Sequence, residues 1–279
     1  MAPRHYAARM TDELPVTLEG DGPDLLCLHG GPGMSDYLST SLGEETLGWR
    51  RIGYTQRGLP PSTTEGPFTV AQHVADAVAV LDGLGLADAV VLGHSWGGFL
   101  AAVLAAEHPD RVRGLLLVDP LGIVGDGGYG RFEEQLLART PDDARQRADE
   151  LDRRALAGEG TEADVVESLR LLWPAYFADP PTAPPMPDVT LCVPSYSGTL
   201  PDALAMLAGG ELPTRAAAYD GPVEVVYGIG SPFPVEASLD TAAAFPHGSA
   251  TGVPDAGHFL WLEQAGCVAD ALVRLGTRL

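Results

Sequence analysis

The run GHSWG at residues 93–97 most constrains what this chain can fold into. A short apolar run at residues 89–92 precedes it, and a stretch of small apolar residues at 99–107 with helical character follows it. Glycines on both sides of a serine let a strand and a helix approach closely, which forces Ser95 into a tight turn at a helix N-terminus. A glycine-rich turn with an incidental serine is the alternative. The flanking strand and helix favour a nucleophilic role for Ser95.

Strand-like and helix-like segments alternate through the first half of the chain. This order predicts an α/β fold with a mostly parallel sheet and helices on both faces. Residues 69–84 have apolar residues at helical spacing and carry Asp and His on the opposite, polar face. The predicted strands are 14–19, 25–28, 49–54, 89–92 and 112–118.

The alternation stops after the predicted strand that ends at Val118. Residues 122–218 are rich in Asp, Arg, Pro and Ala, and they predict helices and loops inserted as a lid. Strand and helix alternation returns with a strand at 223–227, a helix at 235–244, a short strand near Ala250 and one closing helix at 260–275. We therefore expect a single domain with core segments 1–121 and 219–279 and the lid at 122–218.

A second glycine-rich run, HGGPG at residues 29–33, directly follows the predicted strand 25–28. Such a turn leaves backbone N–H groups unobstructed, so they can point at an oxygen of a ligand. Gly31, together with the N–H of Trp96, is predicted to form an oxyanion hole. A phosphate loop or a plain turn is the alternative, but the run lacks the lysine of a phosphate loop.

A serine nucleophile needs a base, and His258 has the position expected for one. It follows Gly257 on a loop between the last predicted strand and the closing helix. The other histidines are interpreted differently. His29 is expected to shape its loop, and His94 is too close in sequence to Ser95 to act as its base. The remaining histidines are expected on the surface, namely His5, His73, His108 and His247.

These motifs resemble the α/β-hydrolase superfamily, and in particular its proline-iminopeptidase-like branch. The matching runs are HGGPG at 29–33, YTQRG at 54–58, GHSWGG at 93–98 and GHF at 257–259, although Thr55 stands where that branch usually has Asp. The resemblance implies an α/β-hydrolase fold and cleavage of small amides, peptides or esters without a cofactor or metal. The lid residues resemble the branch only in where they are inserted.

The chain departs from the resemblance at the acidic residue. The family usually has Asp in a G-x-x-D-P segment after the strand at 223–227, and Ser231 occupies that position in GIGSP. Serine supplies no negative charge to stabilise an imidazolium, although it can accept a hydrogen bond from His258. Asp119, at the carboxyl end of strand 112–118, is the predicted substitute. Its alternative role is to cap the turn at Pro120.

Three hypotheses for function follow. The leading one is a serine hydrolase that acts on a small ester, lactone or amide through an acyl-enzyme on Ser95. The second is a non-hydrolytic lyase, cyclase or isomerase, suggested by the departure at Ser231. The third is a degenerate member that only binds a ligand. In the lid, Trp173, Tyr176 and Phe177 either line a substrate pocket or anchor the lid to the core.

Composition limits the partners. The formal net charge is −21, so nucleic acid and anionic membranes are poor partners, and a small-molecule substrate is expected. Residues 1–10 lack the apolar core of a signal peptide, and no apolar run approaches the roughly 18 residues of a membrane span. The three cysteines suggest no disulfide framework. We expect a cytoplasmic protein, and the sequence indicates no oligomeric state.

Overall fold

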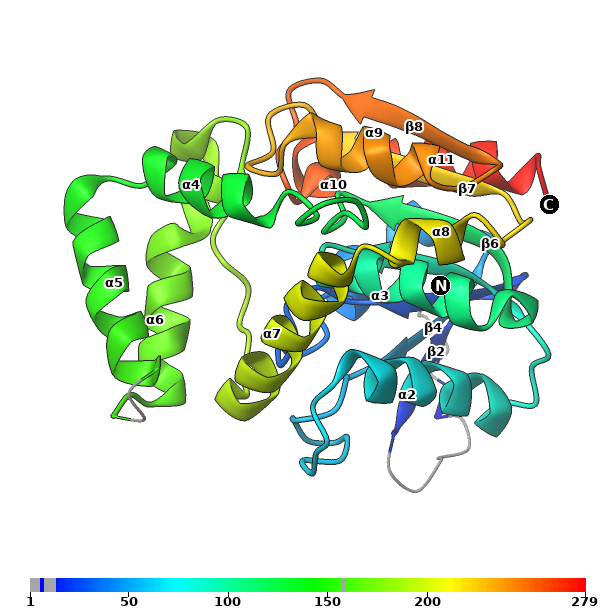
Figure 1. The fold of residues 1–279 in the computed structure, drawn as a ribbon, viewed down its shortest axis with the longest axis horizontal. Helices are drawn as coiled ribbons and strands as arrows, with labels where there is room; N and C mark the ends of the chain where they lie inside the picture. Colours follow the sequence, from blue (N-terminus) through cyan, green and yellow to red (C-terminus); the bar gives the residue numbers. More distant parts are fainter. Residues whose placement is uncertain (1–5, 8–13, 157–158) are drawn as a thin grey trace.

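A computed structural model describes residues 6–7, 14–156 and 159–279. The described chain forms one eight-stranded sheet in the spatial order β1-β2-β4-β3-β5-β6-β7-β8 (Figure 1). The β1–β2 and β2–β4 pairs are antiparallel, and the other pairs are parallel. The strands are β1 (Tyr6–Ala7), β2 (Val16–Glu19), β3 (Asp24–Leu28), β4 (Arg50–Tyr54), β5 (Ala89–His94), β6 (Val112–Val118), β7 (Val223–Gly228) and β8 (Gly248–Val253).

Helices connect the parallel strands, as the alternating sequence pattern predicts. The α-helices are α1 (Leu38–Ser41), α2 (Val70–Gly83), α3 (Trp96–Glu107), α4 (Tyr129–Arg139), α5 (Asp142–Leu156), α6 (Glu162–Leu172), α7 (Val193–Gly209), α8 (Leu212–Ala216), α9 (Val235–Ala243), α10 (Leu260–Glu263) and α11 (Cys267–Gly276). The 3₁₀ turns are η1 (Glu44–Thr46), η2 (Pro109–Arg111), η3 (Trp173–Tyr176) and η4 (Pro180–Thr182). The fold class predicted from the sequence is confirmed.

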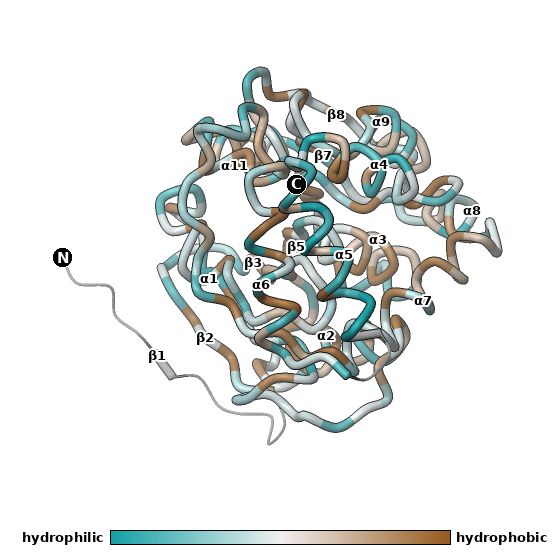
Figure 2. Tube along the Cα trace, turned by 90° about the vertical axis from the view of Figure 1, so that its left-hand side faces the viewer, coloured by the Kyte–Doolittle hydropathy of each residue, from teal (hydrophilic) through white to brown (hydrophobic). Residues whose placement is uncertain are grey.

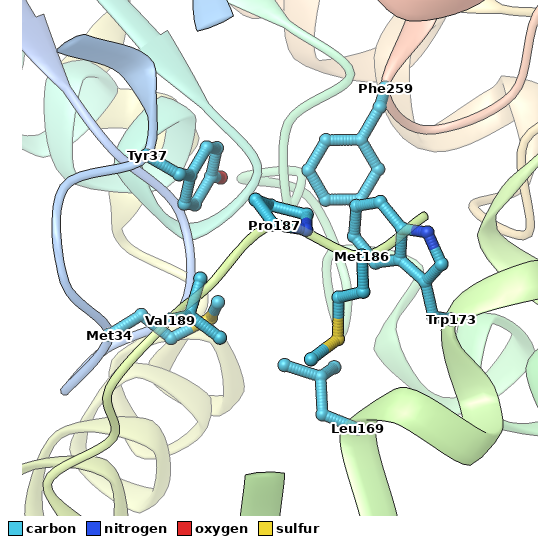
Figure 3. Close-up of a pocket in the computed structure, with 8 residues that line it drawn as sticks. All are labelled: Met34, Tyr37, Leu169, Trp173, Met186, Pro187, Val189 and Phe259. Atoms are coloured by element: carbon cyan, nitrogen blue, oxygen red, sulfur yellow. The ribbon is translucent and has the colours of Figure 1, made fainter. Parts of the chain in front are cut away.

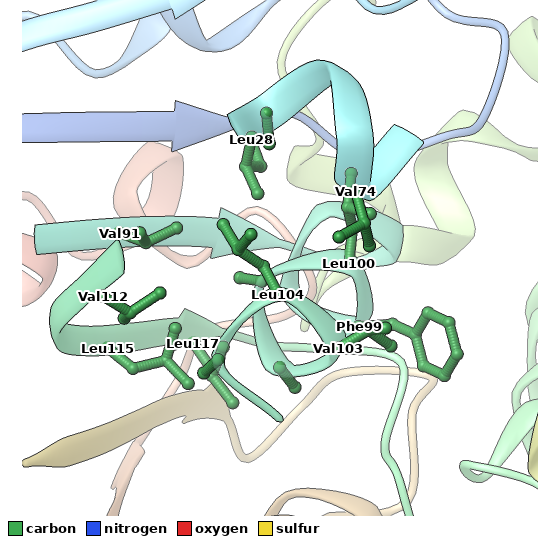
Figure 4. Packing of buried hydrophobic residues seen from close by; sticks show 14 of the residues in the cluster. Leu28, Val74, Val91, Phe99, Leu100, Val103, Leu104, Val112, Leu115 and Leu117 are labelled. Atoms are coloured by element: carbon green, nitrogen blue, oxygen red, sulfur yellow. The ribbon is translucent and has the colours of Figure 1, made fainter. Parts of the chain in front are cut away.

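Apolar side chains cover both faces of the sheet, because successive residues of a strand point to opposite sides. Leu115 and Leu117 of β6 belong to the cluster that packs under α2 and α3 (Figure 4). Leu116 and Val118 of the same strand belong to the cluster on the other face, with α1 and α11. The central strands are therefore apolar on both sides, which explains why they appear in the sequence as continuous apolar runs.

The chain between β6 and β7 leaves the sheet before it returns. α5 and α6 pack side by side as a hairpin that projects from the sheet end at the left of Figure 1. α5 is strongly hydrophilic along most of its length, in contrast to the apolar strand β3 (Figure 2). α7 and α8 then lead back over α2 and α3. The lid boundaries at 122 and 218 stay a prediction.

Two local predictions were wrong. The closing helix predicted at 260–275 is two helices, α10 and α11, because Gly266 between them has a φ of +87°. His73, predicted to lie on the surface, is fully buried on α2, where its Nε2 lies 3.2 Å from the Thr199 hydroxyl. Asp76 on the same helix is also buried, because it forms a two-pronged ion pair with Arg57.

In the described ranges, no helix is both long enough and apolar enough to cross a bilayer. His5 and most of the N-terminal stretch 1–10, on which the absence of a signal peptide was predicted, lie outside the described residues. Cys27, Cys192 and Cys267 are free thiols, and the first two are buried.

Burial of His73 makes folding sensitive to pH. Burial is the main cause that lowers the pKa of this histidine from 6.5 to about 4, so the folded state excludes a proton that the unfolded state accepts. We expect the unfolding free energy to fall from about pH 7 to about pH 5, with His73 contributing about 2 kcal/mol of the loss. Urea unfolding at both pH values, for the wild type and His73→Gln, measures this contribution. An equal decline in the two proteins would contradict it.

Candidate active site

The turn between β5 and α3 holds Ser95 in a strained backbone conformation. Its φ is 58° and its ψ is −123°, a region that residues other than glycine rarely adopt. The Ser95 amide donates to the Val118 carbonyl at 3.1 Å, and the Leu121 amide donates to the Ser95 carbonyl at 3.1 Å. The elbow is thus tied to the end of β6. Strain of this kind is typical of functional sites, and the surrounding sheet maintains it.

Glycine is required on both sides of Ser95 because the backbones nearly touch. A Cβ at Gly93 would lie 2.1 Å from the Gly97 carbonyl oxygen. A Cβ at Gly97 would lie 2.0 Å from the carbonyl oxygen of Leu28, at the end of β3. These contacts involve backbone atoms that side-chain rotation cannot move. The two glycines therefore let α3 start directly against β3 and β5.

The glycine-rich loop after β3 lies against the same serine. A Cβ at Gly30 would be 2.8 Å from the Ser95 Cβ, and Gly31 has a φ of +62°. Trp96 is the first residue of α3, and the first amides of a helix have no carbonyl partner within it. The structure thus places the predicted oxyanion residues Gly31 and Trp96 on the two backbone segments that flank Ser95.

Asp119 and His258 are hydrogen-bonded. Asp119 directly follows β6 with a φ of 41°, and its Oδ2 lies 2.6 Å from His258 Nδ1. The same carboxylate accepts a bond from the Gly228 amide at 3.1 Å and one from the Ser231 hydroxyl at 2.6 Å. Asp119 and His258 are both 2% exposed, so solvent does not compete for the pair.

The role considered for Ser231, as an acceptor for His258, does not match the structure. Its hydroxyl donates to Asp119 Oδ2, and its oxygen accepts from the Phe233 amide at 3.1 Å. Arg139 of α4 stabilises the loop after β7 by donating hydrogen bonds to the carbonyls of Gly230 and Ser231. Ser231, in the position where the family usually has the acid, therefore contacts Asp119 at the end of the neighbouring strand β6.

Burial sets the charge states of the pair. Loss of hydration raises the pKa of Asp119, and the hydrogen bonds from Ser231 and Gly228 oppose this rise. Loss of hydration lowers the pKa of His258 below its usual value, so its imidazole is neutral at neutral pH. The pKa of Asp119 is raised to about 7, so the pair has an ionised form in which the carboxylate accepts from the neutral imidazole. In that form the ring proton is on Nδ1 and Nε2 is an acceptor.

The His258 ring is surrounded by aromatic residues from the core and from the lid. The ring of His94, the residue before Ser95, lies 4.5 Å from it between centroids. Tyr176 of η3 lies 5.5 Å away, and its carbonyl accepts from the His258 amide at 2.8 Å. Phe233 lies 5.3 Å away. Among the described residues, no hydrogen bond joins His258 to the Ser95 hydroxyl, a bond that often tightens only once substrate is bound.

A small apolar cavity lies between the core and the lid (Figure 3), and Phe259, the residue after His258, is the lining residue nearest in sequence to the site. Met34, Tyr37 and Phe259 line it from the core, and Trp173 lines it from η3. The other lining residues are Leu169, Met186, Pro187 and Val189. In the aromatic cluster of the lid, Trp173 lines the pocket whereas Phe177 is fully buried against Phe259, so this cluster both lines a pocket and anchors the lid.

Sequence reasoning missed two participants near the site. Tyr37 and His94 form hydrogen bonds that connect the loop after β3 to the loop that carries His258. Tyr37 lies at no motif position, so the sequence offers no signal for it. His29 is buried and accepts from the Gln56 amide, in agreement with a loop-shaping role, and His247 is exposed beside Asp220.

The fold and the elbow define a protein of the α/β-hydrolase architecture. A family model described as alpha/beta hydrolase fold matches residues 23–265, and the chain belongs to that family. A 2-hydroxymuconate semialdehyde hydrolase from Pseudomonas putida is 33% identical over 112 residues, which cover 38% of this chain and 39% of the relative. A proline iminopeptidase from Lactobacillus delbrueckii subsp. bulgaricus is 31% identical over 109 residues, or 36% and 37% of the two chains.

The chain therefore aligns with only about two-fifths of the length of these curated relatives. A solved structure covers far more. The proline iminopeptidase of Mycobacterium smegmatis superposes with a TM-score of 0.67 at 21% identity, covering 99% of this chain and 98% of that one. At this identity the likeness shows the shared fold.

The close approach at the elbow gives a test of folding. We expect Gly97→Ala to destabilise the protein by about 3 kcal/mol or more, because the added methyl group meets backbone that cannot yield. Gly209→Ala is the matched control, since a Cβ at this exposed helical glycine meets nothing within 4 Å. It is expected to preserve stability or raise it by about 0.5–1 kcal/mol. Thermal unfolding compares the two variants, and equal midpoints would refute the steric argument.

Proposed function

We propose that this protein is a serine hydrolase that cleaves a small ester, lactone or amide through an acyl-enzyme on Ser95. The observation that carries the proposal is the 2.6 Å contact of Asp119 Oδ2 with His258 Nδ1, beside the strained elbow of Ser95. In this proposal Asp119 takes the role of the acid, because position 231, where the family usually has Asp, is Ser. The family membership and the hydrolase names of the relatives support the same reaction class.

The proposed steps use the ionised form of Asp119 and the neutral form of His258. His258 Nε2 takes the proton of the Ser95 hydroxyl as its oxygen bonds to the substrate carbonyl carbon. Asp119 holds the ring through Nδ1 and stabilises the imidazolium that forms. His258 then returns the proton to the departing alcohol or amine. Water, deprotonated by the same nitrogen, attacks the acyl carbon and releases the acid and Ser95.

The negative charge of the tetrahedral intermediate requires donors that are already in place. The amides of Gly31 and Trp96 are proposed to hold it, because they lie on the two segments that flank Ser95. The N-terminus of α3 adds a favourable electrostatic field at this point.

The pocket narrows the proposed substrate. The surface that its lining residues expose is apolar, and none of these residues is charged. Burial of an ionised group there would be costly without a partner. We therefore propose that the part of the substrate that faces Phe259 and Trp173 is uncharged (Figure 3), although the cavity as it stands is too small to hold a substituent.

Lyase, cyclase or isomerase chemistry was considered because the usual acid is replaced by Ser231. Asp119 beside His258 removes that reason, since a carboxylate is hydrogen-bonded to the histidine from the neighbouring strand. A function limited to ligand binding gains no support from a site that has a strained serine and an ordered acid–histidine pair. Hydrolysis is the function that the geometry supports best.

The first test is chemical labelling. We expect a fluorophosphonate probe to attach to Ser95 in the folded protein, and peptide mass spectrometry to locate the adduct. Ser95→Ala is expected to abolish both labelling and turnover of p-nitrophenyl esters, because the acyl-enzyme needs the hydroxyl. A series of acyl chains, with matched chains that end in a carboxylate, tests the apolar pocket. Turnover that survives Ser95→Ala would instead favour lyase or isomerase chemistry.

The second test concerns the acid. Asp119→Asn keeps the shape but removes the charge, so kcat is expected to fall by about 10⁴-fold, as for other triad acids. Ser231→Ala removes one donor to Asp119 but leaves the carboxylate, so we expect a fall of about tenfold or less. Ester hydrolysis by both variants measures the ratio. If Ser231→Ala costs as much as Asp119→Asn, Asp119 is not the principal acid.

A further inference from the structure

A buried chain of hydrogen bonds joins the loop after β3 to the loop after β8. The Gly30 amide donates to the Tyr37 hydroxyl oxygen at 2.9 Å. That oxygen lies 2.5 Å from His94 Nδ1, and His94 Nε2 lies 2.9 Å from the carbonyl oxygen of His258. These hydrogen bonds run through His94, the residue before Ser95, and connect a proposed oxyanion segment with the proposed base.

Only one arrangement of protons satisfies all three contacts. A carbonyl oxygen accepts and never donates, so His94 Nε2 must carry a proton. Burial lowers the pKa of His94, which keeps the ring neutral and leaves Nδ1 as an acceptor. Tyr37 must therefore donate its proton to His94 Nδ1. The hydroxyl oxygen then accepts from the Gly30 amide, and every group in the chain has a partner.

Burial and aromatic packing restrict the side chains of Tyr37 and His94, which form these hydrogen bonds. His94 is fully buried and Tyr37 is 7% exposed. Phe259 and Trp261 pack on the His94 ring at centroid distances of 5.1 Å and 4.8 Å. A hydrogen bond in such an environment is strong, and the loss of one member leaves a buried polar group unsatisfied.

We propose that Tyr37 and His94 are positioning residues that set the distance between the oxyanion donors and the catalytic histidine. This inference rests on the proposed function. The polar atoms of both side chains are used within this set of hydrogen bonds, so both act through the loops that they orient. Tyr37 orients the peptide at Gly30, and His94 orients the backbone of His258, so one chain of bonds controls both loops.

The hydrogen bond between Gly30 and Tyr37 also determines which amide of the loop is free to face the substrate. The Gly30 N–H is committed to Tyr37, and Pro32 has no N–H. Within residues 30–32, the Gly31 amide is the one left for an oxyanion. Loss of the Tyr37 hydroxyl frees Gly30 to rotate, which misdirects the Gly31 amide.

The protein contains a second buried tyrosine that serves as a control for the loss of the Tyr37 hydroxyl. Tyr54 of β4 is buried like Tyr37, but its hydroxyl has no hydrogen-bond partner among the described residues. Tyr37→Phe and Tyr54→Phe each remove one buried hydroxyl and keep the ring. Tyr54→Phe controls for the loss of a buried hydroxyl as such, whereas Tyr37→Phe also leaves the Gly30 amide and His94 Nδ1 without their partner. The positioning role is therefore judged by the ester-to-thionoester ratio and not by stability.

The kinetic experiment compares an ester with the corresponding thionoester, whose sulfur is a poor acceptor in an oxyanion hole. For Tyr37→Phe we expect kcat for the ester to fall about tenfold to a hundredfold, with KM within about threefold of the wild type. The ratio of ester to thionoester rates falls with it. Tyr54→Phe keeps the wild-type rates and ratio. If Tyr37→Phe keeps the wild-type ratio, the positioning role is overturned.

A spectroscopic experiment tests the chain independently of turnover. Nitrogen NMR of the wild-type ring is expected to show His94 as the neutral Nε2–H tautomer at neutral pH, and Tyr37→Phe to shift its Nδ1 resonance. Loss of the signal in His94→Gln assigns it. An Nδ1–H tautomer would overturn the inference. If the wild type neither turns over esters nor labels at Ser95, the proposed function fails and the positioning role fails with it, whereas the NMR result still decides whether Tyr37 donates to His94.

Discussion

The contact between Asp119 Oδ2 and His258 Nδ1 connects loops from two strands that are not neighbours in the sheet. Asp119 follows β6, His258 follows β8, and β7 lies between these two strands. The loop after β7 contributes the Gly228 amide and the Ser231 hydroxyl to the same carboxylate. The loops at the carboxyl ends of three consecutive parallel strands therefore meet at the Asp119 carboxyl group. Parallel α/β sheets commonly bind ligands at this edge.

That arrangement depends on tight backbone packing. Gly93 and Gly97 allow β3, β5 and α3 to meet within contact distance, and the meeting point is where Ser95 is strained. Ser95 and Asp119 both have positive φ values, which cost free energy and persist only because the sheet and its two apolar clusters hold them. The stability of the core is therefore linked directly to the geometry of the site.

Most features that depend on residues close in sequence were predicted correctly, and several features that depend on contacts between distant residues were not. The strands and the elbow were predictable because apolar runs and glycine spacing act within a few residues. His73 and Asp76 were assigned to a solvated face, since the sequence does not show that Arg57 and Thr199 reach that face of α2. The break between α10 and α11 was missed because Gly266 was not recognised as a position with positive φ.

The sequence by itself determined the strand–turn–helix elbow at Ser95, the glycine-rich loop and the order of serine before histidine, because each is a local pattern with a steric requirement. Tertiary structure decided the partners of the histidine. Asp119 lies 139 positions from His258, and Tyr37 lies 57 positions from His94, so only the folded sheet brings them together. A hydrogen bond needs atoms placed within about 3 Å, and sequence spacing does not specify such distances between remote segments.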